Sequence, residues 1–143
     1  MTALLGIVLL LGGIFSPTAA AAPPTAHPPI EVTVALGNNA NELKFFPSNL
    51  ELVAGQRYKL LLSNPSPQKH YFTAKDFADA SWTQKVEAGK VEVKGAIHEL
   101  ELKPEGEAEW VIVPMKPGTY EFHCPIPGHT EAGMRGTIAI ATQ

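Results

Sequence analysis

The stretch YEFHCPIPGHTEAGMRGTI, residues 120–138, has the pattern of a strand, a loop and the start of a second strand, and it contains the only cysteine of the chain. Successive side chains of a strand point to opposite faces, so Phe122 and Cys124 are expected to share the inward face. The loop that follows contains two prolines and two glycines, and it can turn His129 and Met134 back toward the Cys124 sulfur. The stretch therefore predicts that a thiolate, an imidazole and a thioether meet at one end of a β-domain.

Short alternating segments on both sides of this stretch indicate an all-β chain. Residues 30–36 and 57–64 alternate apolar and polar positions, which is the signal of half-buried strands. Turn signals separate the segments, and the chain contains 12 glycines and 13 prolines. Short strands without a long helical pattern favour an antiparallel β-sandwich or barrel, with room for one helical turn within 73–82. Further strands are expected at 43–46, 50–53, 70–74, 85–88, 91–94, 98–102, 107–113, 118–124 and 136–142.

Length, charge and cysteine count narrow the class of protein. The 143 residues suit one domain, and 14 acidic against 11 basic residues give a net charge of −3. This balance does not favour binding to nucleic acid or to an anionic membrane surface. One cysteine cannot form an intramolecular disulfide, and a lone thiol in an oxidising compartment needs burial or a bound metal.

The N-terminal residues have the composition of a secretory signal. An apolar run at 4–15 is followed by small residues, with an Ala-x-Ala type cleavage site near 19–22. We expect a signal peptide at 1–22, a Pro-rich linker at 23–29 and one folded domain at 30–143. The protein is then exported to the periplasm or an equivalent extracytoplasmic space; an uncleaved N-terminal segment would instead anchor it to a membrane.

The donor types around Cys124 favour copper. Soft sulfur ligands select Cu(I), and imidazole binds copper in either oxidation state, whereas zinc rarely takes a thioether. Cys124, His129 and Met134 provide only one imidazole, and a trigonal site with an axial methionine needs a second one. His70 is the best candidate for this second imidazole ligand. It follows the 57–64 strand and the turn NPSPQK, where the chain is expected to re-enter the sheet at the end that carries the Cys124 loop. Two His, one Cys and a long axial Met make a blue-copper electron-transfer site.

With these residues the sequence resembles the small type 1 copper proteins of the cupredoxin family, and is similar to plastocyanin, azurin, auracyanin and rusticyanin. The resemblance covers residues 30–143 and is carried by NPSPQKH, PGTYEFHCPIPGH and GMRGTI. The Cys-x4-His-x4-Met spacing resembles auracyanin and rusticyanin more than plastocyanin. The resemblance implies a Greek-key β-sandwich with one copper ion per chain, cycling between Cu(I) and Cu(II). It implies His70, Cys124 and His129 as equatorial ligands and Met134 as the axial ligand.

One departure from the family pattern lies at Tyr71. Many family members carry Asn or Ser after the first ligand histidine, where the side chain braces the ligand loop. The backbone N–H of Tyr71 can still donate to the Cys124 sulfur, and so can that of Ile126. Pro125 and Pro127 have no N–H to donate, but their fixed φ angles are expected to stiffen the loop.

The remaining histidines and a run of acidic residues have plainer interpretations. His27 lies in the linker and is expected to be solvated, and His123 faces away from Cys124. His98 shares a strand face with two leucines, so a core or edge position is expected. The acidic string is either a solvated face or a patch for a basic partner; it consists of Glu99, Glu101, Glu105, Glu107 and Glu109.

These features together predict a one-electron carrier rather than an enzyme, with redox protein partners that dock near His129. One alternative is a copper-binding carrier, which shares the ligands but needs exchangeable metal. A less favoured alternative is a component of a copper-dependent oxidoreductase. A multicopper oxidase needs histidines on both sides of the cysteine, and here the neighbours are His123 and Pro125. A binuclear copper site needs two cysteines and is excluded.

Overall fold

The computed structural model describes residues 20, 23 and 27–143. Within these residues the chain forms strands joined by short loops and one helical turn. In chain order the elements are β1 (Ile30–Leu36), β2 (Phe45–Phe46), β3 (Asn49–Val53), β4 (Tyr58–Ser63), β5 (His70–Thr73), α1 (Lys75–Asp79), β6 (Ser81–Ala88), β7 (Val91–Val93), β8 (Glu99–Leu102), β9 (Glu107–Pro114), β10 (Gly118–His123) and β11 (Arg135–Ala141).

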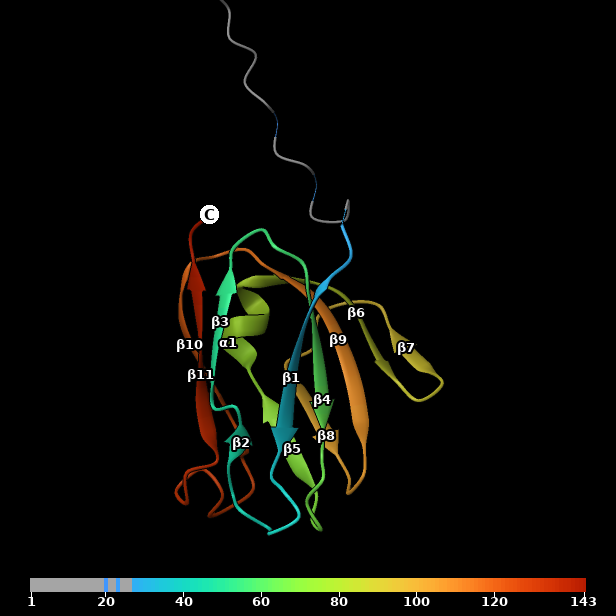
Figure 1. Ribbon diagram of the computed structural model, residues 1–143, viewed down its shortest axis with the longest axis vertical. Helices are drawn as coiled ribbons and strands as arrows, with labels where there is room; N and C mark the ends of the chain where they lie inside the picture. The colour runs from blue at the N-terminus through green and yellow to red at the C-terminus, as the bar shows by residue number, and fades with distance from the viewer. Residues whose placement is uncertain (1–19, 21–22, 24–26) are drawn as a thin grey trace, which may run out of the picture.

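The strands build a β-sandwich of two sheets (Figure 1). The six-stranded sheet has the order β2-β1-β4-β9-β6-β7, and the five-stranded sheet has the order β3-β11-β10-β5-β8. The predicted all-β sandwich is confirmed, but its sheets are mixed rather than antiparallel throughout. β1 pairs parallel with β4, and β3 pairs parallel with β11, because crossover connections bring strands from distant parts of the chain side by side.

Alternation along the strands fills the space between the sheets. In β4 the side chains of Tyr58, Leu60 and Leu62 are buried while their neighbours are half-buried. Trp110 and Ile112 of β9 meet them in the same core cluster. Each such side chain contributes about 1.5–3 kcal/mol of hydrophobic stabilisation when it is fully buried. The predicted short helix is confirmed as α1, which buries Phe77 and Ala78.

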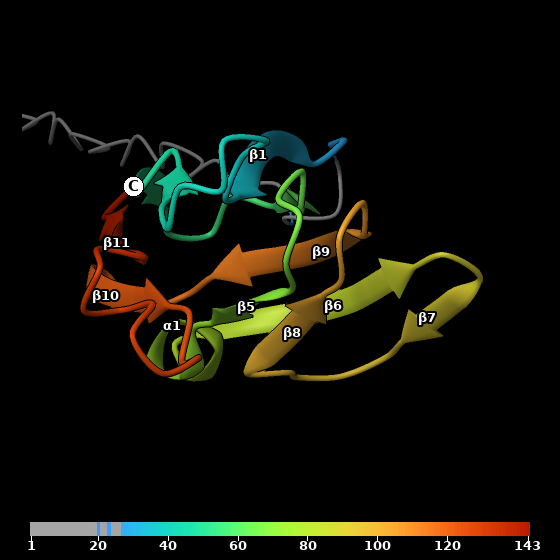
Figure 2. The same cartoon turned by 90° about the horizontal axis from the view of Figure 1, so that it is seen from below.

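β6 begins earlier than expected, at Ser81 rather than residue 85. A register shift between Thr83 and Lys85 places a bulge in its pairing with β9. The bulge adds one residue, so Thr83 and Val86 are both buried although they are three positions apart. Thr83 tolerates burial because its hydroxyl accepts a hydrogen bond from Trp110 Nε1 at 3.1 Å. Beyond the bulge, the β6–β7 hairpin extends past the body of the sandwich (Figure 2).

The loops that matter most for function gather at one end of the sandwich. The connections after β1, between β4 and β5, and after β10 all lie at the lower end in Figure 1, and the C-terminus lies at the upper end. The predicted signal peptide and cleavage site lie almost entirely outside the described residues. Among the residues that are described, no helix has the length and apolar character that crossing a membrane requires.

Candidate metal centre

Three of the four predicted ligands converge at the loop end of the sandwich. Cys124 Sγ lies 3.5 Å from His129 Nδ1 and 3.9 Å from His70 Nδ1. One donor atom from each residue lies within 4.8 Å of the others, and all three residues are buried. The two imidazole rings are 5.2 Å apart between centroids and tilted by 56°. The three donors therefore face one small common space.

Two neighbouring strands hold Cys124 and His70 in place. Cys124 follows the last residue of β10, and His70 is the first residue of β5 in the same sheet. Phe122 lies two residues before the cysteine and Phe72 two residues after the histidine. Their rings stack at 4.9 Å, and Phe45 packs edge-on against Phe122 at 4.8 Å. This aromatic packing fixes the spacing of the ligand-bearing strands.

Backbone hydrogen bonds close the loop that carries the other donors. Cys124 N–H donates to Met134 O at 3.1 Å, and Met134 N–H donates to His129 O at 2.9 Å. Thr130 Oγ1 donates to Cys124 O at 2.8 Å and ties the middle of the loop to its start. Met134 is fully buried and belongs to the same core cluster as Cys124. The loop thus places the predicted axial residue against the cysteine.

The second strand leaves this loop through a very tight contact at Gly136. A Cβ atom at this position would lie 2.2 Å from Ser48 O and 2.3 Å from Phe122 Cζ. Only glycine allows β11 to pass this close to the aromatic ring beneath the cysteine. Packing under the metal centre therefore explains why the GMRGTI segment has glycine at position 136.

His70 is held as a neutral ligand. It is fully buried, and its Nε2 atom lies 3.1 Å from Ser66 Oγ. Burial, reinforced by the nearby His129, lowers the pKa of His70 to about 4 from its ordinary value of 6.5. At neutral pH the ring therefore carries no charge and can offer a lone pair to a metal.

The cysteine sulfur receives one of the two hydrogen bonds expected from the sequence. Tyr71 N–H donates to Cys124 Sγ at 3.4 Å. In the described residues no such bond comes from Ile126, so that prediction is wrong. The carbonyl of Ile126 accepts a hydrogen bond from His129 N–H at 2.9 Å, which closes a turn. The Tyr71 side chain does not brace the loop, because its hydroxyl donates to Glu101 at the surface.

The other histidines stay away from the cluster. His27 is exposed, and His123 lies on the opposite face of β10 from Phe122. His98 lies at the start of the β8 edge but does not join the leucines of that strand. Its Nε2 atom lies 2.7 Å from Asp79 Oδ1, and its side chain is 46% exposed.

The acidic string does not form one continuous face. Glu99 and Glu101 belong to β8 of the five-stranded sheet and accept hydrogen bonds from Thr73 and Tyr71. Glu109 belongs to β9 of the other sheet and pairs with Lys59 at 3.4 Å. The string is thus divided between the sheets, and some of its charge is neutralised.

Sequence reasoning missed the residues that support the ligands. Asn64 and Ser66 were recognised only as part of a turn, and Thr130 only as part of the loop. The signal that could have found the first two is NPSP, since Asn and Ser in a turn bond to nearby backbone groups.

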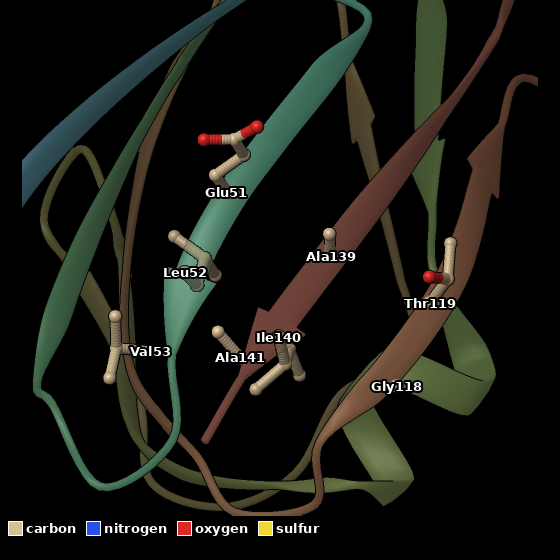
Figure 3. A pocket seen from close by; sticks show the side chains of 8 residues that line it. All are labelled: Glu51, Leu52, Val53, Gly118, Thr119, Ala139, Ile140 and Ala141. Carbon is tan, nitrogen blue, oxygen red and sulfur yellow. The ribbon is translucent and has the colours of Figure 1, made fainter. Parts of the chain in front are cut away.

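A groove of about 560 Å³ lies elsewhere, on the outer face of the five-stranded sheet (Figure 3). Its floor is wide because Ala139, Ala141 and Gly118 have little or no side chain there. No histidine or cysteine lines it, and Glu51 is its one carboxylate. The groove offers no set of converging donors, so the buried cluster remains the candidate functional site.

The donors of the cluster fit copper better than zinc or a hard cation. Two imidazole nitrogens and one thiolate sulfur form the trigonal set, and Met134, whose backbone bonds to Cys124 and His129, supplies a buried thioether. With this combination of donors, His70, Cys124, His129 and Met134 form a type 1 copper-like site.

Comparisons with known proteins agree with the fold of this chain. The chain is 24% identical to plastocyanin from Dryopteris crassirhizoma over 75% of this chain and 97% of that protein. The structure is similar to auracyanin from Roseiflexus castenholzii, with a TM-score of 0.56, 21% identity, and coverage of 78% of this chain and 96% of the other. It also matches part of the multicopper oxidase McoA from Aquifex aeolicus, with a TM-score of 0.64, 15% identity, and coverage of 86% of this chain and 32% of the oxidase.

The family model of the cupredoxin-like domain matches residues 4–140, which is nearly the whole chain. The observed β-sandwich agrees with this match. This chain belongs to the cupredoxin-like family.

Proposed function

We propose that this protein is an exported one-electron carrier that binds one copper ion through His70, Cys124, His129 and Met134. The observation that carries the proposal is the convergence of three buried donor atoms, all within 4.8 Å of one another. Copper supplies a one-electron Cu(I)/Cu(II) couple when bound in such a site. The relatives support the choice of metal, since auracyanin A from Chloroflexus aurantiacus is described as a "blue" copper protein.

The residues around the cluster suit electron transfer because they restrict movement of the ligands. The sheet holds His70 through β5, while the loop closed by Cys124 and Met134 holds the other donors independently. Pro125 and Pro127 limit the backbone angles of that loop. A site that keeps its shape in both oxidation states needs little reorganisation, and electron exchange is then fast.

Catalysis is less well supported than electron transfer. The chain covers only about a third of the McoA oxidase, and within residues 27–143 the structure shows one His/Cys/carboxylate cluster suited to a metal. His123 faces away from that cluster, and Pro125 replaces the second flanking histidine that an oxidase would need. A copper carrier is also less favoured, because a fully buried Cys124 and His70 hinder exchange of the metal.

Docking of redox partners is proposed at the end of the sandwich beside His129. His129 is 7% exposed, and the loop around it presents Pro125, Pro127 and Gly128 to solvent. Weak redox encounters use small interfaces, and an uncharged surface permits approach without desolvation of charge. Glu131 is exposed and is the only Asp, Glu, Lys or Arg between Cys124 and Met134, so this loop carries a single formal charge.

The test of the copper assignment is the visible absorption of the copper-loaded protein. We expect an intense thiolate-to-copper band in the wild type and its loss in Cys124→Ser, because the band requires a copper–sulfur bond. Circular dichroism of the variant shows whether the sandwich is intact. A band that persists in a folded Cys124→Ser protein would rule out the cysteine as a ligand.

The test of the carrier role is turnover. The loaded protein is expected to cycle between oxidised and reduced states with chemical reagents, without consuming nitrite or oxygen. Sustained consumption of either substrate would favour an oxidoreductase. Rapid loss of copper to a competing chelator under mild conditions would favour a copper carrier.

A further inference from the structure

The ring nitrogen of His70 that faces away from the cysteine has a side-chain partner rather than a backbone one. Nε2 of His70 and Oγ of Ser66 lie 3.1 Å apart, and the two residues are 0% and 2% exposed. A buried polar pair of this kind is isolated from water, so its geometry is set by the protein alone. The orientation of the ring therefore depends on what holds Ser66.

Asn64 holds the backbone of Ser66 from one side. Ser66 N–H donates to Asn64 Oδ1 at 2.9 Å. Asn64 Nδ2 donates in turn to Gln68 O at 2.9 Å and to Leu102 O at 2.7 Å. Asn64 is 1% exposed, and Leu102 pairs with His70 in the sheet. The loop that carries the hydroxyl is thus fixed to the strand next to the ligand.

The hydrogen bonds around Ser66 Oγ determine which atom carries the proton. Gln68 N–H donates to this oxygen at 3.3 Å, and the hydroxyl itself donates to Asn41 Oδ1 at 3.4 Å. Asn41 Oδ1 also accepts a hydrogen bond from Gln68 Nε2 at 2.7 Å, which identifies it as an acceptor. A hydroxyl has one proton and two lone pairs. With the proton directed to Asn41 and one lone pair used by Gln68, the second lone pair faces His70 Nε2.

The consequence is that Nε2 of His70 must be the protonated nitrogen of the neutral ring. Nδ1 then keeps its lone pair, and Nδ1 is the atom that lies 3.9 Å from Cys124 Sγ. In the other tautomer an N–H group would point into the donor cluster. Gly37 confines the ring further, since a Cβ there would lie 3.1 Å from His70 Nε2 and 2.9 Å from Ser66 Cβ.

We propose that Ser66, with its hydroxyl oriented by Asn41, is a positioning residue that fixes the tautomer and the ring orientation of His70 before any metal binds. The inference rests on the proposed function, in which His70 is a copper ligand. In this proposal the side chain of Ser66, a turn residue, supports the ring of His70. Partners of this kind typically affect metal affinity 10–100-fold.

The test compares Ser66→Ala with Ser81→Ala as a matched control. The Ser81 hydroxyl also makes a hydrogen bond within the protein, to Phe77 O at 2.8 Å, but it lies outside the donor cluster. In the metal-free protein, nitrogen NMR of the His70 ring is expected to show protonated Nε2 in the wild type and in Ser81→Ala. In Ser66→Ala we expect a substantial fraction of the Nδ1-protonated tautomer.

Copper(I) affinity, measured by competition with a chelator, provides the second readout. We expect a loss of about 10–100-fold in Ser66→Ala and a change of less than about twofold in Ser81→Ala. Unchanged ring nitrogens together with unchanged affinity in Ser66→Ala would overturn the proposal. If the wild type bound no copper, the proposed function would fail, while the NMR of the metal-free protein would still decide the role of Ser66.

A second variant covers the case in which Ser66→Ala does not fold. Asn41→Gly removes the acceptor of the Ser66 proton and keeps the backbone angle, because Asn41 has a φ of 59° that glycine adopts readily. The freed hydroxyl can then donate to His70 Nε2, so a measurable Nδ1-protonated fraction is expected. A ring that stays entirely Nε2-protonated in Asn41→Gly would contradict the orienting role of this hydroxyl.

Discussion

Met134 is the proposed axial ligand and supplies a thioether. It is fully buried in the core cluster, and hydrogen bonds to Cys124 and His129 fix its backbone on both sides. The axial position tunes the potential of a blue-copper site. A thioether there favours Cu(I), and a harder oxygen donor favours Cu(II).

We therefore expect Met134→Gln to keep a coloured site and to lower its potential. A tenfold change in the relative stability of the two oxidation states corresponds to about 59 mV for one electron, and we expect a shift of at least this size. Met134→Leu removes the donor without adding oxygen and serves as the control. Protein-film voltammetry measures both, and unchanged potentials in the two variants would show that Met134 is not the axial ligand.

The buried state of His70 makes the stability of the metal-free protein depend on pH. Its pKa is lowered to about 4 by burial and by His129, whereas in the unfolded chain it has the ordinary value near 6.5. Between these values the unfolded chain binds a proton that the folded protein does not. The free energy of unfolding therefore falls as the pH decreases from about 6.5 to 4, and the contribution is complete above 6.5.

The loss is expected to amount to about 3 kcal/mol across this window. Urea unfolding of the metal-free protein at a series of pH values measures it. His70→Gln has no titrating group at this position and provides the comparison, so its curve should lack this component. Parallel pH curves for the two proteins would mean that His70 titrates normally in the folded state.

At the scale of elements, the loop after β1 is shaped to accommodate the ligand on β5. Gly37 follows Leu36, has a φ of 80°, and lies against the His70 ring and Ser66. Replacement by alanine introduces both backbone strain and a contact that is too close. Gly89, in the turn between β6 and β7, has a φ of 58° but open space around it.

We expect Gly37→Ala to lower the free energy of unfolding more than Gly89→Ala does. The backbone strain costs about 1–2 kcal/mol in each variant, and overpacking adds about 1–3 kcal/mol at Gly37 only. Gly37→Ala should also weaken copper binding, because the ring of His70 must move. Equal stabilities and equal copper affinities for the two variants would show that the loop at Gly37 can move to accept the alanine without displacing His70.

The elements were predictable where alternation is regular and long-range pairing is not needed. The boundaries of β1 and β4 follow from their alternating residues, and α1 from a short helical segment. β6 was expected to be shorter, because its bulge reverses which side chains face the core after Thr83. The parallel β1–β4 and β3–β11 pairs were not predicted, since local patterns carry no information on crossover connections.

The same distinction applies to the site. Cys124, His129 and Met134 were found because one loop carries them, and His70 because of its place after a turn. The role of Ser66 depends on how the turn folds against Asn41, 25 residues earlier in the chain. The contact between Ser66 and Asn41 forms only in the folded protein, so a local sequence motif cannot predict it.

At the scale of the whole molecule, the donor cluster and the C-terminus lie at opposite ends of the sandwich (Figure 1). The end beside His129, where we propose that partners dock, is therefore remote from the C-terminus. The His129 side chain is mostly covered, and the neighbouring residues 125–128 are exposed or half-buried, so we propose that electrons leave the protein across this loop. A charge placed on this loop should hinder approach without altering the donors.

We therefore expect Ile126→Glu to slow electron self-exchange at least tenfold while leaving the visible spectrum nearly intact, because like charges then meet across the closest contact. Ile126 is half-buried in the loop beside His129, and its replacement changes no donor atom. Val91→Glu is the matched control, since Val91 is 62% exposed and belongs to β7, a strand that lies away from the ligand loops in Figure 1. Stopped-flow or NMR line-broadening rates at several salt concentrations decide the matter. If correctly loaded Ile126→Glu exchanged electrons as fast as Val91→Glu, electrons would have to leave the protein by another surface.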